Sequence, residues 1–469
     1  MSTIRPKIRY HHRSNAPKHA PCPHCGTLGV RRQRLQRTVR SLAYQAILLI
    51  RVTTAEYDAR CTCGRTFRTQ VAGIEPKAKY TNSVREAVLD RLLEDHMSLE
   101  RIIAALRRDF LLELSPGFVY DCLRWKIRQV DMAAYRQWTL QQFSGTLCVD
   151  EIHLGRFTLL LATDPLGDFP VAFALVSHND QEHMSRFLKQ LAGHGLKPRV
   201  VVTDGSSLYP TVLATVWPEV EHQLCIFHVV QDLNRCVLDA VCRLRKQLAR
   251  RGGRRHGRRG RPSKDQAIQQ QRRRTLQQKA LFVFRHRYLV VKGRAAFSAQ
   301  DNKDLVTLLD YLPALRVLRR FVDQVERLFA RAQTPEQAQR RWQELSRDPE
   351  FAADADLARA VQQLSVDKFP KMVAFLQSPL GQRVRTNNHV ERMNRKLRHY
   401  EKVRYCWRRA SAVVRFVVLT VARMWQARQP LPGPQVYAPA GQSPSDQAPT
   451  SPRALRGSVA LPALVSAVA

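Results

Sequence analysis

The chain has 469 residues, 44% of them hydrophobic, and a formal net charge of +38 at pH 7. The apolar fraction suits a globular protein of several domains and excludes a wholly disordered chain. The excess of positive charge indicates a polyanionic partner, most simply nucleic acid. No apolar run approaches the roughly 18 residues of a membrane-spanning helix, and the first residues lack a signal-peptide pattern. Because the 10 cysteines are too few for a disulfide scaffold, we expect a cytoplasmic protein.

The first part of the chain predicts a zinc-binding domain. Residues 1–19 are basic and rich in His, Asn and Pro, which predicts a flexible arm. Two cysteine pairs follow, Cys22 with Cys25 and Cys61 with Cys63, and a glycine comes directly after each pair. Such pairs can present thiolates to one tetrahedral Zn²⁺, and the β-rich text between them fits a zinc ribbon over residues 20–75. The alternative is four unrelated buried thiols.

Residues 80–130 change to helical patterning, with candidate N-caps at Thr81 and Ser98. Three short helices with tight turns suit a helix-turn-helix DNA-binding domain. Its last helix would bring Arg124 and Lys126 into the major groove. A structural helical linker is the alternative.

The next region predicts a sheet that ends in acids. Three apolar, β-rich runs follow one another over residues 147–176, and the first stops at Asp150. A helical pattern leads to a fourth run, which stops at Asp204, and a short helix and a last strand over residues 222–229 come after it. This order is that of a ribonuclease-H-like sheet with helices on both faces. Carboxylates at the ends of buried strands are costly unless they pair or coordinate, so two of them suit a divalent-metal site.

Basic and helical segments follow the sheet. Residues 243–264 are almost wholly basic and Gly-rich, which predicts a loop without a packed core. Within it Arg259 and Arg261 resemble the core of an AT-hook, which inserts arginines into the DNA minor groove; a disordered phosphate-binding loop is an equal alternative. Apolar residues at 3–4 spacing predict an all-α insertion over residues 265–380, and the Pro-, Ala-, Ser- and Gln-rich residues 429–469 predict a disordered tail.

A third acid lies on a predicted helix capped by Thr386 or Asn387, which carries Glu391 in its early turns. An apolar stripe on this helix consists of Val390, Met393 and Leu397. The basic residues beside the acid are Arg392, Arg395 and Lys396. A carboxylate beside basic groups suits a site that holds metal and phosphate together, whereas a salt-bridged surface helix is the alternative.

The order of these features resembles the DDE transposases of bacterial insertion sequences, particularly those with a zinc-binding N-terminus and kinship to the Mutator-like group. The resemblance spans about residues 20–425 and depends on the zinc cysteines, the helix-turn-helix pattern, Asp150 in Val-Asp-Glu, Asp204 in Thr-Asp-Gly and Glu391 in Asn-Asn-His-Val-Glu-Arg. It implies a multidomain α/β protein with a ribonuclease-H-like catalytic domain over residues 143–425. It also implies that Asp150, Asp204 and Glu391 are catalytic and hold two Mg²⁺ or Mn²⁺ ions, with Zn²⁺ as a structural ion.

The implied function is transposition of DNA. The protein would bind the ends of its element, cleave them by water attack and join the freed 3′-OH to target DNA. Its partner is therefore double-stranded DNA in the bacterial nucleoid, and joining two ends implies a homo-oligomer. A catalytically inactive DNA-binding regulator and another ribonuclease-H-like nuclease are the alternatives.

Several further residues take expected roles from this resemblance or from their position. Cys225 and His228 match a C-x-x-H signature of such enzymes, with a structural or DNA-related role; a metal role would need two more ligands. His389, together with the basic residues beside Glu391, would position phosphates. Glu151 should point to the opposite strand face from Asp150. The competing acids, Asp164 and Asp168, are expected to be solvated in a turn.

Overall fold

The computed structural model describes residues 7–58, 63–251, 264–403 and 407–429. The chain forms two compact units. Of the described residues, the first unit holds those up to Tyr135, the short stretch Leu154–Arg156 and those from Arg395 to Gln429, and the second unit holds Arg136–His153 and Phe157–Asn394. None of the helices in these described ranges is long and apolar enough to cross a membrane.

The first unit begins with a sheet in the order β1-β4-β3-β2, in which β5 also pairs with β4. Its strands are β1 (Lys7–Asn15), β2 (His19–Pro21), β3 (Leu28–Ser41), β4 (Ala46–Asp58) and β5 (Thr66–Arg68). The long strands β3 and β4 form an antiparallel hairpin. Apolar side chains from this hairpin, such as Val39, Ile50 and Val52, are buried in a small core.

The prediction of a flexible arm over residues 1–19 is wrong for the described part of that segment. Strand β1 pairs in parallel with β4 along all its residues, from Lys7 with Ala46 to Asn15 with Thr54. Every β1 side chain is exposed, so the polar composition correctly reflects a lack of burial. The strand forms because backbone hydrogen bonds to a neighbouring strand need no apolar side chain.

Three helices follow in the first unit: α1 (Asn82–Leu93), α2 (Leu99–Phe110) and α3 (Pro116–Ile127). Ser98 caps α2 by accepting a hydrogen bond from the backbone of Arg101, as its position predicts. Helix α16 (Ala410–Gln426) packs against α3, and Arg423 of α16 pairs with Asp90 of α1 at 2.8 Å. The four helices therefore form one helical layer in this unit.

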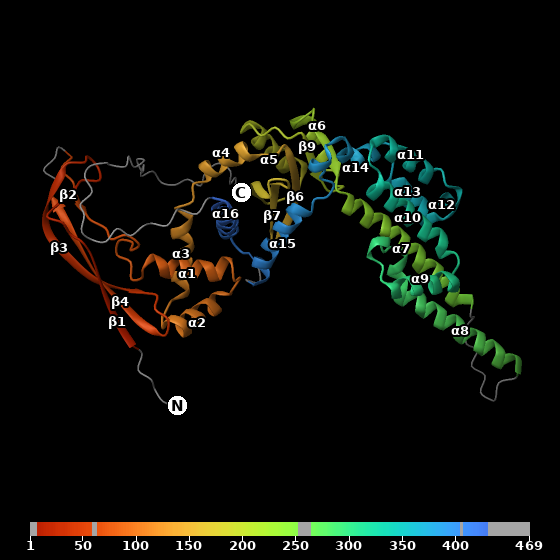
Figure 1. The fold of residues 1–469 in the computed structure, drawn as a ribbon, viewed down its shortest axis with the longest axis horizontal. Helices are drawn as coiled ribbons and strands as arrows, with labels where there is room; N and C mark the ends of the chain where they lie inside the picture. The colour runs from red at the N-terminus through yellow and green to blue at the C-terminus, as the bar shows by residue number, and fades with distance from the viewer. Residues whose placement is uncertain (1–6, 59–62, 252–263, 404–406, 430–469) are drawn as a thin grey trace. The chain divides into compact units, whose positions relative to one another are not determined.

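The second unit is built around a sheet in the order β10-β9-β6-β7-β8. Figure 1 labels its strands β6, β7 and β9. The strands are β6 (Thr146–Leu154), β7 (Phe157–Asp164), β8 (Phe169–Val176), β9 (Val200–Thr203) and β10 (Glu221–Leu224). Strands β6, β9 and β10 are parallel, and β7 and β8 are antiparallel. The bounds of β7, β8 and β9 closely match the predicted runs, because fully buried strands have continuous apolar sequences. The prediction that the first run stops at Asp150 is wrong, because β6 continues through Asp150 and Glu151 to Leu154, and Ile152 and Leu154 are buried.

Helices flank this sheet, beginning with α4 (Met132–Gln142), which leads from the first unit into the second. Helix α5 (Gln181–Gly193) lies between β8 and β9 in the chain, and α6 (Tyr209–Val216) lies between β9 and β10. Leu147 and Val149 of β6 share one core with Met184 of α5 and Tyr209 of α6. The strand that carries the first acid is thus fixed by apolar contacts on this face.

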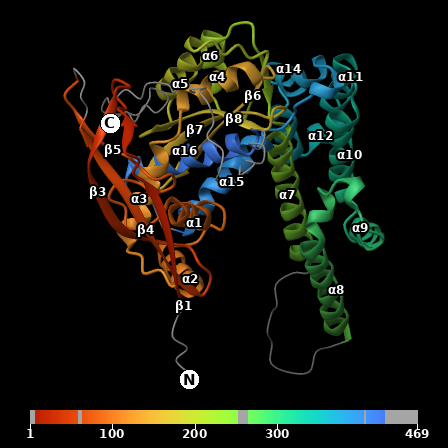
Figure 2. The same cartoon turned by 60° about the vertical axis from the view of Figure 1, so that its left-hand side comes forward.

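A helical insertion leaves the sheet after β10. Helices α7 (Ile226–Arg251) and α8 (Lys264–His286) lie side by side (Figure 1 and, in a turned view, Figure 2). The remaining helices are α9 (Ala299–Tyr311), α10 (Leu315–Arg331), α11 (Pro335–Ser346), α12 (Pro349–Ala353), α13 (Ala355–Gln363) and α14 (Phe369–Val373). They bury one continuous apolar core, which confirms the prediction of an all-α insertion.

Two predicted boundaries around this insertion are wrong. The basic loop was expected from residue 243, but α7 continues to Arg251. There Arg243 pairs with Asp354 at 2.6 Å and with Asp356 at 2.9 Å, so partners distant in sequence neutralise its charge. The last strand was expected over residues 222–229, but β10 ends at Leu224. The Cys61, Arg259 and Arg261 positions and residues 430–469 of the predicted tail lie outside the described residues.

The insertion returns to the sheet close to where it left. The backbone N–H of Ile226 donates to the carbonyl of Arg385 over 2.9 Å. Buried Gln223 of β10 donates to the carbonyl of Met372 over 3.0 Å and accepts from the N–H of Phe375 over 2.7 Å. The two ends of the insertion are therefore fixed to the same edge of the sheet.

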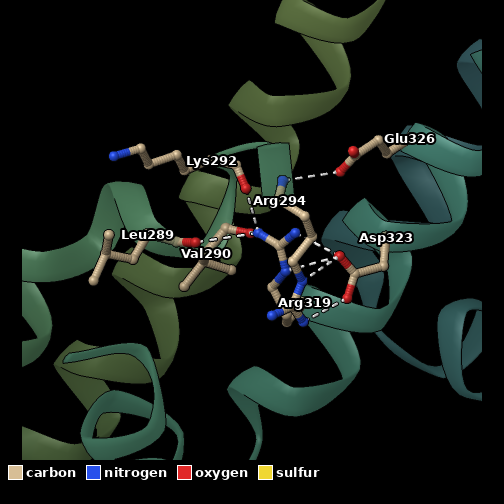
Figure 3. A network of polar contacts seen from close by, with 7 residues as sticks. All are labelled: Leu289, Val290, Lys292, Arg294, Arg319, Asp323 and Glu326. Carbon is tan, nitrogen blue, oxygen red and sulfur yellow. Dashed lines mark hydrogen bonds and ion pairs between the residues drawn. The ribbon is translucent and has the colours of Figure 1, made fainter. Parts of the chain in front are cut away.

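A buried arginine organises the interior of the insertion (Figure 3). The side chain of Arg319 is 3% exposed and donates to the carbonyls of Leu289, Val290 and Lys292 at 3.2, 3.1 and 2.6 Å. Its Nε also donates to Asp323 over 3.1 Å. A planar guanidinium can satisfy carbonyls and a carboxylate at once, so Arg319 joins α10 to the turn that follows α8.

Candidate active site

Asp150 and Asp204 lie at the same level on neighbouring parallel strands. Strand β6 pairs with β9 in a register that aligns Cys148 with Val202. Asp150 and Asp204 each come two residues after these partners, and side chains two residues apart share a face of a strand. The sheet therefore brings the two predicted acids together, with Asp150 in the middle of β6 and Asp204 directly after β9.

Glu391 comes from helix α15 (Asn388–Val403), whose first intrahelical bond runs from the N–H of Glu391 to the carbonyl of Asn387 at 3.2 Å. The predicted apolar stripe of Val390, Met393 and Leu397 is buried, with exposures of 0, 6 and 2%. One turn after Glu391, the amide of Asn394 donates to Oδ2 of Asp150 over 2.8 Å. The helix face that bears Glu391 is thus held against the middle of β6.

Hydrogen bonds join the three acid-bearing segments directly. The buried side-chain amide of Asn387 donates to the carbonyl of Val149 over 3.1 Å. The backbone N–H of Asn387 donates to Sγ of Cys225 over 3.2 Å, and the N–H of Cys225 donates to the carbonyl of Thr203 over 2.8 Å. Val149 and Thr203 directly precede Asp150 and Asp204, so this network fixes the spacing of the acids.

The electrostatics of the site favour a bound cation. Burial raises the pKa of Asp150 to about 7, and the charges of Glu151, Asp204 and Glu391 act in the same direction. Burial also raises the pKa of Asp204, opposed by a hydrogen bond from the Ser206 backbone. Oδ1 of Asp204 accepts this bond over 2.9 Å. Carboxylates crowded in this way fit divalent cations, which supply the missing positive charge and prefer oxygen ligands.

Glu151 is held on the other side of the strand from Asp150. It accepts hydrogen bonds from Asn179, over 3.0 Å, and from the hydroxyl of Tyr209 on α6. These partners differ from the α15 partner of Asp150, as alternation along a strand predicts. Its charge nevertheless contributes to the raised pKa of both Asp150 and Asp204.

Cys225 and His228 lie at the junction of β10 and α7, next to Glu391. Nε2 of His228 is 3.7 Å from Oε1 of Glu391. A hydrogen bond with Cys225 raises the pKa of His228 to about 9, and the charges of Glu391 and Asp204 act in the same direction. Cys225, His228 and Glu391 together offer one sulfur, one nitrogen and one oxygen ligand atom within 4.8 Å of one another. The sequence pattern did not indicate Glu391 as a neighbour of this pair.

Two predicted phosphate-positioning residues contact an acid instead. The nearly buried ring of His389 lies 2.8 Å from Oδ1 of Asp168, and Arg392 donates to the same oxygen over 3.0 Å. Burial lowers the pKa of His389 despite this carboxylate. The other basic residues on this helix point outward to different degrees, with Arg395 exposed and Lys396 partly exposed.

The expectation that Asp164 is solvated is wrong. Its side chain is fully buried, with an exposure of 0%. It accepts hydrogen bonds from the N–H and hydroxyl of Ser144, at 2.7 and 2.8 Å, and from the N–H groups of Leu166 and Gly167, at 2.9 and 2.8 Å. These donors stabilise a buried carboxylate, which therefore anchors the turn between β7 and β8. Asp168 in the same turn is 60% exposed, as expected.

The remaining predicted site residues lie in the first unit. Sγ of Cys63 is 3.9 Å from Sγ of Cys22 and 3.5 Å from Sγ of Cys25, so these three thiols could hold a metal ion. Arg124 pairs with Asp121 on its own helix. Lys126, only 16% exposed, pairs with Glu86 at 2.6 Å, so its ammonium group is not presented to solvent as a recognition helix requires.

Sequence reasoning missed Asn387 and Asn394 as site residues. Together with Glu391 they occupy positions i, i+4 and i+7, which places all three on one helix face. That spacing could have indicated the two asparagines, since amides on the same helix face as an acid can donate hydrogen bonds into the same pocket. The sequence analysis instead assigned the site to the basic residues beside Glu391, among them Arg395, which is exposed in the structure.

The sequence was compared with curated proteins and with models of protein families, and one family model matches it. No curated protein matches this sequence. A family model for DDE transposases of the ISL3 type, described as transposase, matches residues 147–413. The matched stretch is more than half of the 469 residues and includes Asp150, Asp204 and Glu391. Family membership implies DNA as substrate and the use of divalent metal ions. The chain therefore belongs to a family of insertion-sequence DDE transposases, as its resemblance implied.

Proposed function

We propose that this transposase binds the ends of its insertion sequence and catalyses Mg²⁺-dependent DNA cleavage and strand transfer. Its catalytic carboxylates are Asp150, Asp204 and Glu391. The observation that supports this most is the hydrogen-bond network that ties the segments before all three acids to one another. Such a network fixes the acids relative to one another before substrate binds, which a shared metal site requires.

The catalytic domain is ribonuclease-H-like in this proposal. Its support is the sheet order β10-β9-β6-β7-β8, with the first strand in the centre and two parallel strands added on one side. The first acid lies on the central strand and the second follows its parallel neighbour. Ligand sites of open α/β sheets form outside the carboxyl ends of such strands.

The three carboxylates would hold two Mg²⁺ or Mn²⁺ ions. When bound, these ions neutralise charge on the phosphate and make water or a 3′-OH a better nucleophile. The protein's own groups orient the ligands: Asn394 directs one oxygen of Asp150, and the Ser206 backbone holds one oxygen of Asp204. Oε1 of Glu391 is buried without a hydrogen-bond partner among the described residues, as expected of an atom that awaits a cation.

DNA binding outside the catalytic site is assigned to the first unit and to the basic segments. Helices α1–α3 would act as a helix-turn-helix domain, with Arg124 at the DNA. Cys22, Cys25, Cys61 and Cys63 would hold structural Zn²⁺ in a zinc ribbon, supported by the proximity of three of these thiols. The basic residues that would contact phosphates are Arg259, Arg261, Arg395 and Lys396. A homo-oligomer would bring two element ends together.

The test uses purified full-length protein and labelled DNA that carries the element's terminal repeats. Wild-type protein is expected to cleave the ends in Mg²⁺ and to join them to plasmid DNA. Asp204→Ala and Glu391→Gln should abolish both reactions while DNA binding persists. Glu182→Gln, a change of an exposed acid on α5, is the matched control and should remain active. Unchanged cleavage by Asp204→Ala would refute the catalytic assignment, and cleavage without joining would favour another nuclease.

A further inference from the structure

We propose that Cys225, His228 and Glu391 form a second, softer metal site, which takes Zn²⁺ and thereby withdraws Glu391 from the reaction. The inference rests on the proposed function in one respect, because it assumes that Glu391 is a catalytic ligand. The metal site itself is argued from the arrangement of the three side chains alone.

The ligand atoms are close to the spacing that zinc requires. Sγ of Cys225, a ring nitrogen of His228 and a carboxylate oxygen of Glu391 lie within 4.8 Å of one another, and Nε2 of His228 is 3.7 Å from Oε1 of Glu391. Ligand atoms around a tetrahedral Zn²⁺ are separated by about 3.5 Å, given bond lengths of roughly 2.0–2.3 Å. Small rotations of the side chains therefore suffice to close the site.

Two polar atoms of this group lack hydrogen-bond partners among the described residues. Nδ1 of His228 and Oε1 of Glu391 are both buried without a hydrogen-bond partner among the described residues. Buried polar atoms are nearly always satisfied in folded proteins, so unpaired ones call for a ligand or a solvent molecule. Both unpaired atoms belong to candidate ligands of the same ion.

The sulfur of Cys225 is held in position by its surroundings. Its Sγ accepts a hydrogen bond from the backbone N–H of Asn387 over 3.2 Å. Cys225 also directly precedes α7, which starts at Ile226 and carries His228 in its first turn. The sulfur is thus buried and fixed beside the other two ligand atoms.

The mixed ligand set discriminates between metals. A thiolate and an imidazole favour Zn²⁺ strongly over Mg²⁺, which prefers oxygen ligands and octahedral geometry. Three protein ligands would leave a fourth position for water. Since Oε1 of Glu391 faces His228, an ion bound there competes with the hard-metal site for the same carboxylate. Zn²⁺ is thus expected to inhibit a Mg²⁺-dependent reaction.

Metal binding is tested on the full-length chain. The metal-free protein is titrated with Zn²⁺ by calorimetry and with Co²⁺ by absorption, which reports the thiolate-to-cobalt charge-transfer band. Wild type should bind one equivalent more than Cys225→Ser, in addition to metal held by the N-terminal cysteines. Cys242→Ser is the matched control, because Cys242 lies farther along α7 and is partly exposed; it should behave as wild type.

Variants of the other ligands sharpen the test. His228→Gln and Glu391→Gln should each weaken the additional equivalent by about tenfold or more, as loss of a metal contact does. Circular dichroism confirms that each variant is folded before its titration is interpreted. Equal Zn²⁺ and Co²⁺ binding by wild type and folded Cys225→Ser would overturn the proposal. Should Cys225→Ser not fold, the same comparison is made with His228→Gln, and equal binding would again overturn it.

Inhibition separates this inference from the proposed function. Added Zn²⁺ at fixed Mg²⁺ should reduce wild-type cleavage by about tenfold or more, and each variant is compared only with itself, with and without Zn²⁺. Loss of cleavage in Glu391→Gln with unchanged Zn²⁺ binding would sink the second site and leave the proposed function intact. If Glu391→Gln loses the additional equivalent of Zn²⁺ but cleaves DNA as wild type does, the second metal site stands and the catalytic role of Glu391 is refuted.

Discussion

The side-chain amide of Asn387 donates to the main-chain carbonyl of Val149 over 3.1 Å, across a sequence separation of 238 residues. Val149 directly precedes Asp150, and Asn387 lies one helical turn before Glu391. This single bond therefore couples the positions of two proposed catalytic acids. The side chain that could have capped α15 instead reaches the middle of the central strand.

Asn387→Ala should lower the rate of Mg²⁺-dependent end cleavage by roughly 10- to 100-fold, because an unsatisfied buried carbonyl costs about 1–3 kcal/mol and Glu391 loses its anchor. The measurement is single-turnover cleavage over a range of Mg²⁺ concentrations. Asn388→Ala, at an exposed neighbouring position, is the control and should cleave at the wild-type rate. Equal rates for the two variants would contradict the anchoring role.

A second prediction concerns Asn394, which donates to Asp150 over 2.8 Å. Asn394→Ala removes the donor, whereas Asn394→Asp also places a carboxyl group against Asp150. Like charge disfavours the ionised form, so Asn394→Asp should cleave about tenfold more slowly than Asn394→Ala at neutral pH. The rate of cleavage is measured from about pH 6 to about pH 9, on both sides of neutrality. Identical pH profiles for the two variants would show that the contact does not tune Asp150.

A third prediction concerns the dependence of stability on pH. Burial lowers the pKa of His222 from 6.5 to about 4, and the charge of Lys371 acts in the same direction. Between these values the unfolded chain binds a proton that the folded chain does not. The stabilisation is therefore complete above pH 6.5 and is lost as the pH falls toward 4. Nε2 of His222 contacts the hydroxyl of Thr203 at 2.8 Å, next to Asp204.

His222→Gln should remove this pH dependence, which is on the order of 2 kcal/mol for a mostly buried imidazole. Urea unfolding of wild type and variant at pH values above and below this window gives the two free energies of unfolding. The control is His24→Gln, at an exposed position in the first unit, which should follow wild type. A variant that loses as much stability on acidification as wild type would disprove the role of His222.

A fourth prediction distinguishes two adjacent arginines of α10. Arg319→Met leaves three carbonyls and Asp323 without their buried donor (Figure 3), which should destabilise the insertion by about 3–5 kcal/mol. Arg320→Ala removes ion pairs with Asp348 and Glu350 from a side chain that is 45% exposed. Exposed pairs contribute about 1 kcal/mol or less. Hydrogen exchange of α10 measures both, and equal protection in the two variants would contradict the distinction.

Elements with a strong local pattern could be predicted from the sequence. The buried strands β6, β7 and β8 appear as apolar runs with Gly, Asp and Pro between them, and Ser98 marks the start of α2. The position of Asp204 directly after β9 follows from the fourth run, whereas Asp150 lies in the middle of β6 and not at the predicted strand end. Their alignment at one level follows from parallel pairing, which the order of strands and helices indicates.

Features that depend on distant partners could not be predicted. Strand β1 has no apolar pattern and forms through backbone pairing with β4. Arg243 belongs to a helix because two aspartates more than 100 residues away pair with it. Asp164 is buried because Ser144 and two backbone N–H groups surround it. In each case the decisive group is remote in sequence, so a local window contains no sign of it.

The hydrogen bond between Ile226 and Arg385 holds the two ends of the helical insertion next to each other. Its exit and its return are neighbours, so the separation of the acids does not depend on how much chain lies between those two points. A cassette of different length or topology could be grafted there, provided that it still covers Leu224 and satisfies Gln223. Insertions and deletions at this junction can therefore change the size of the protein and leave the arrangement of the three acids unchanged.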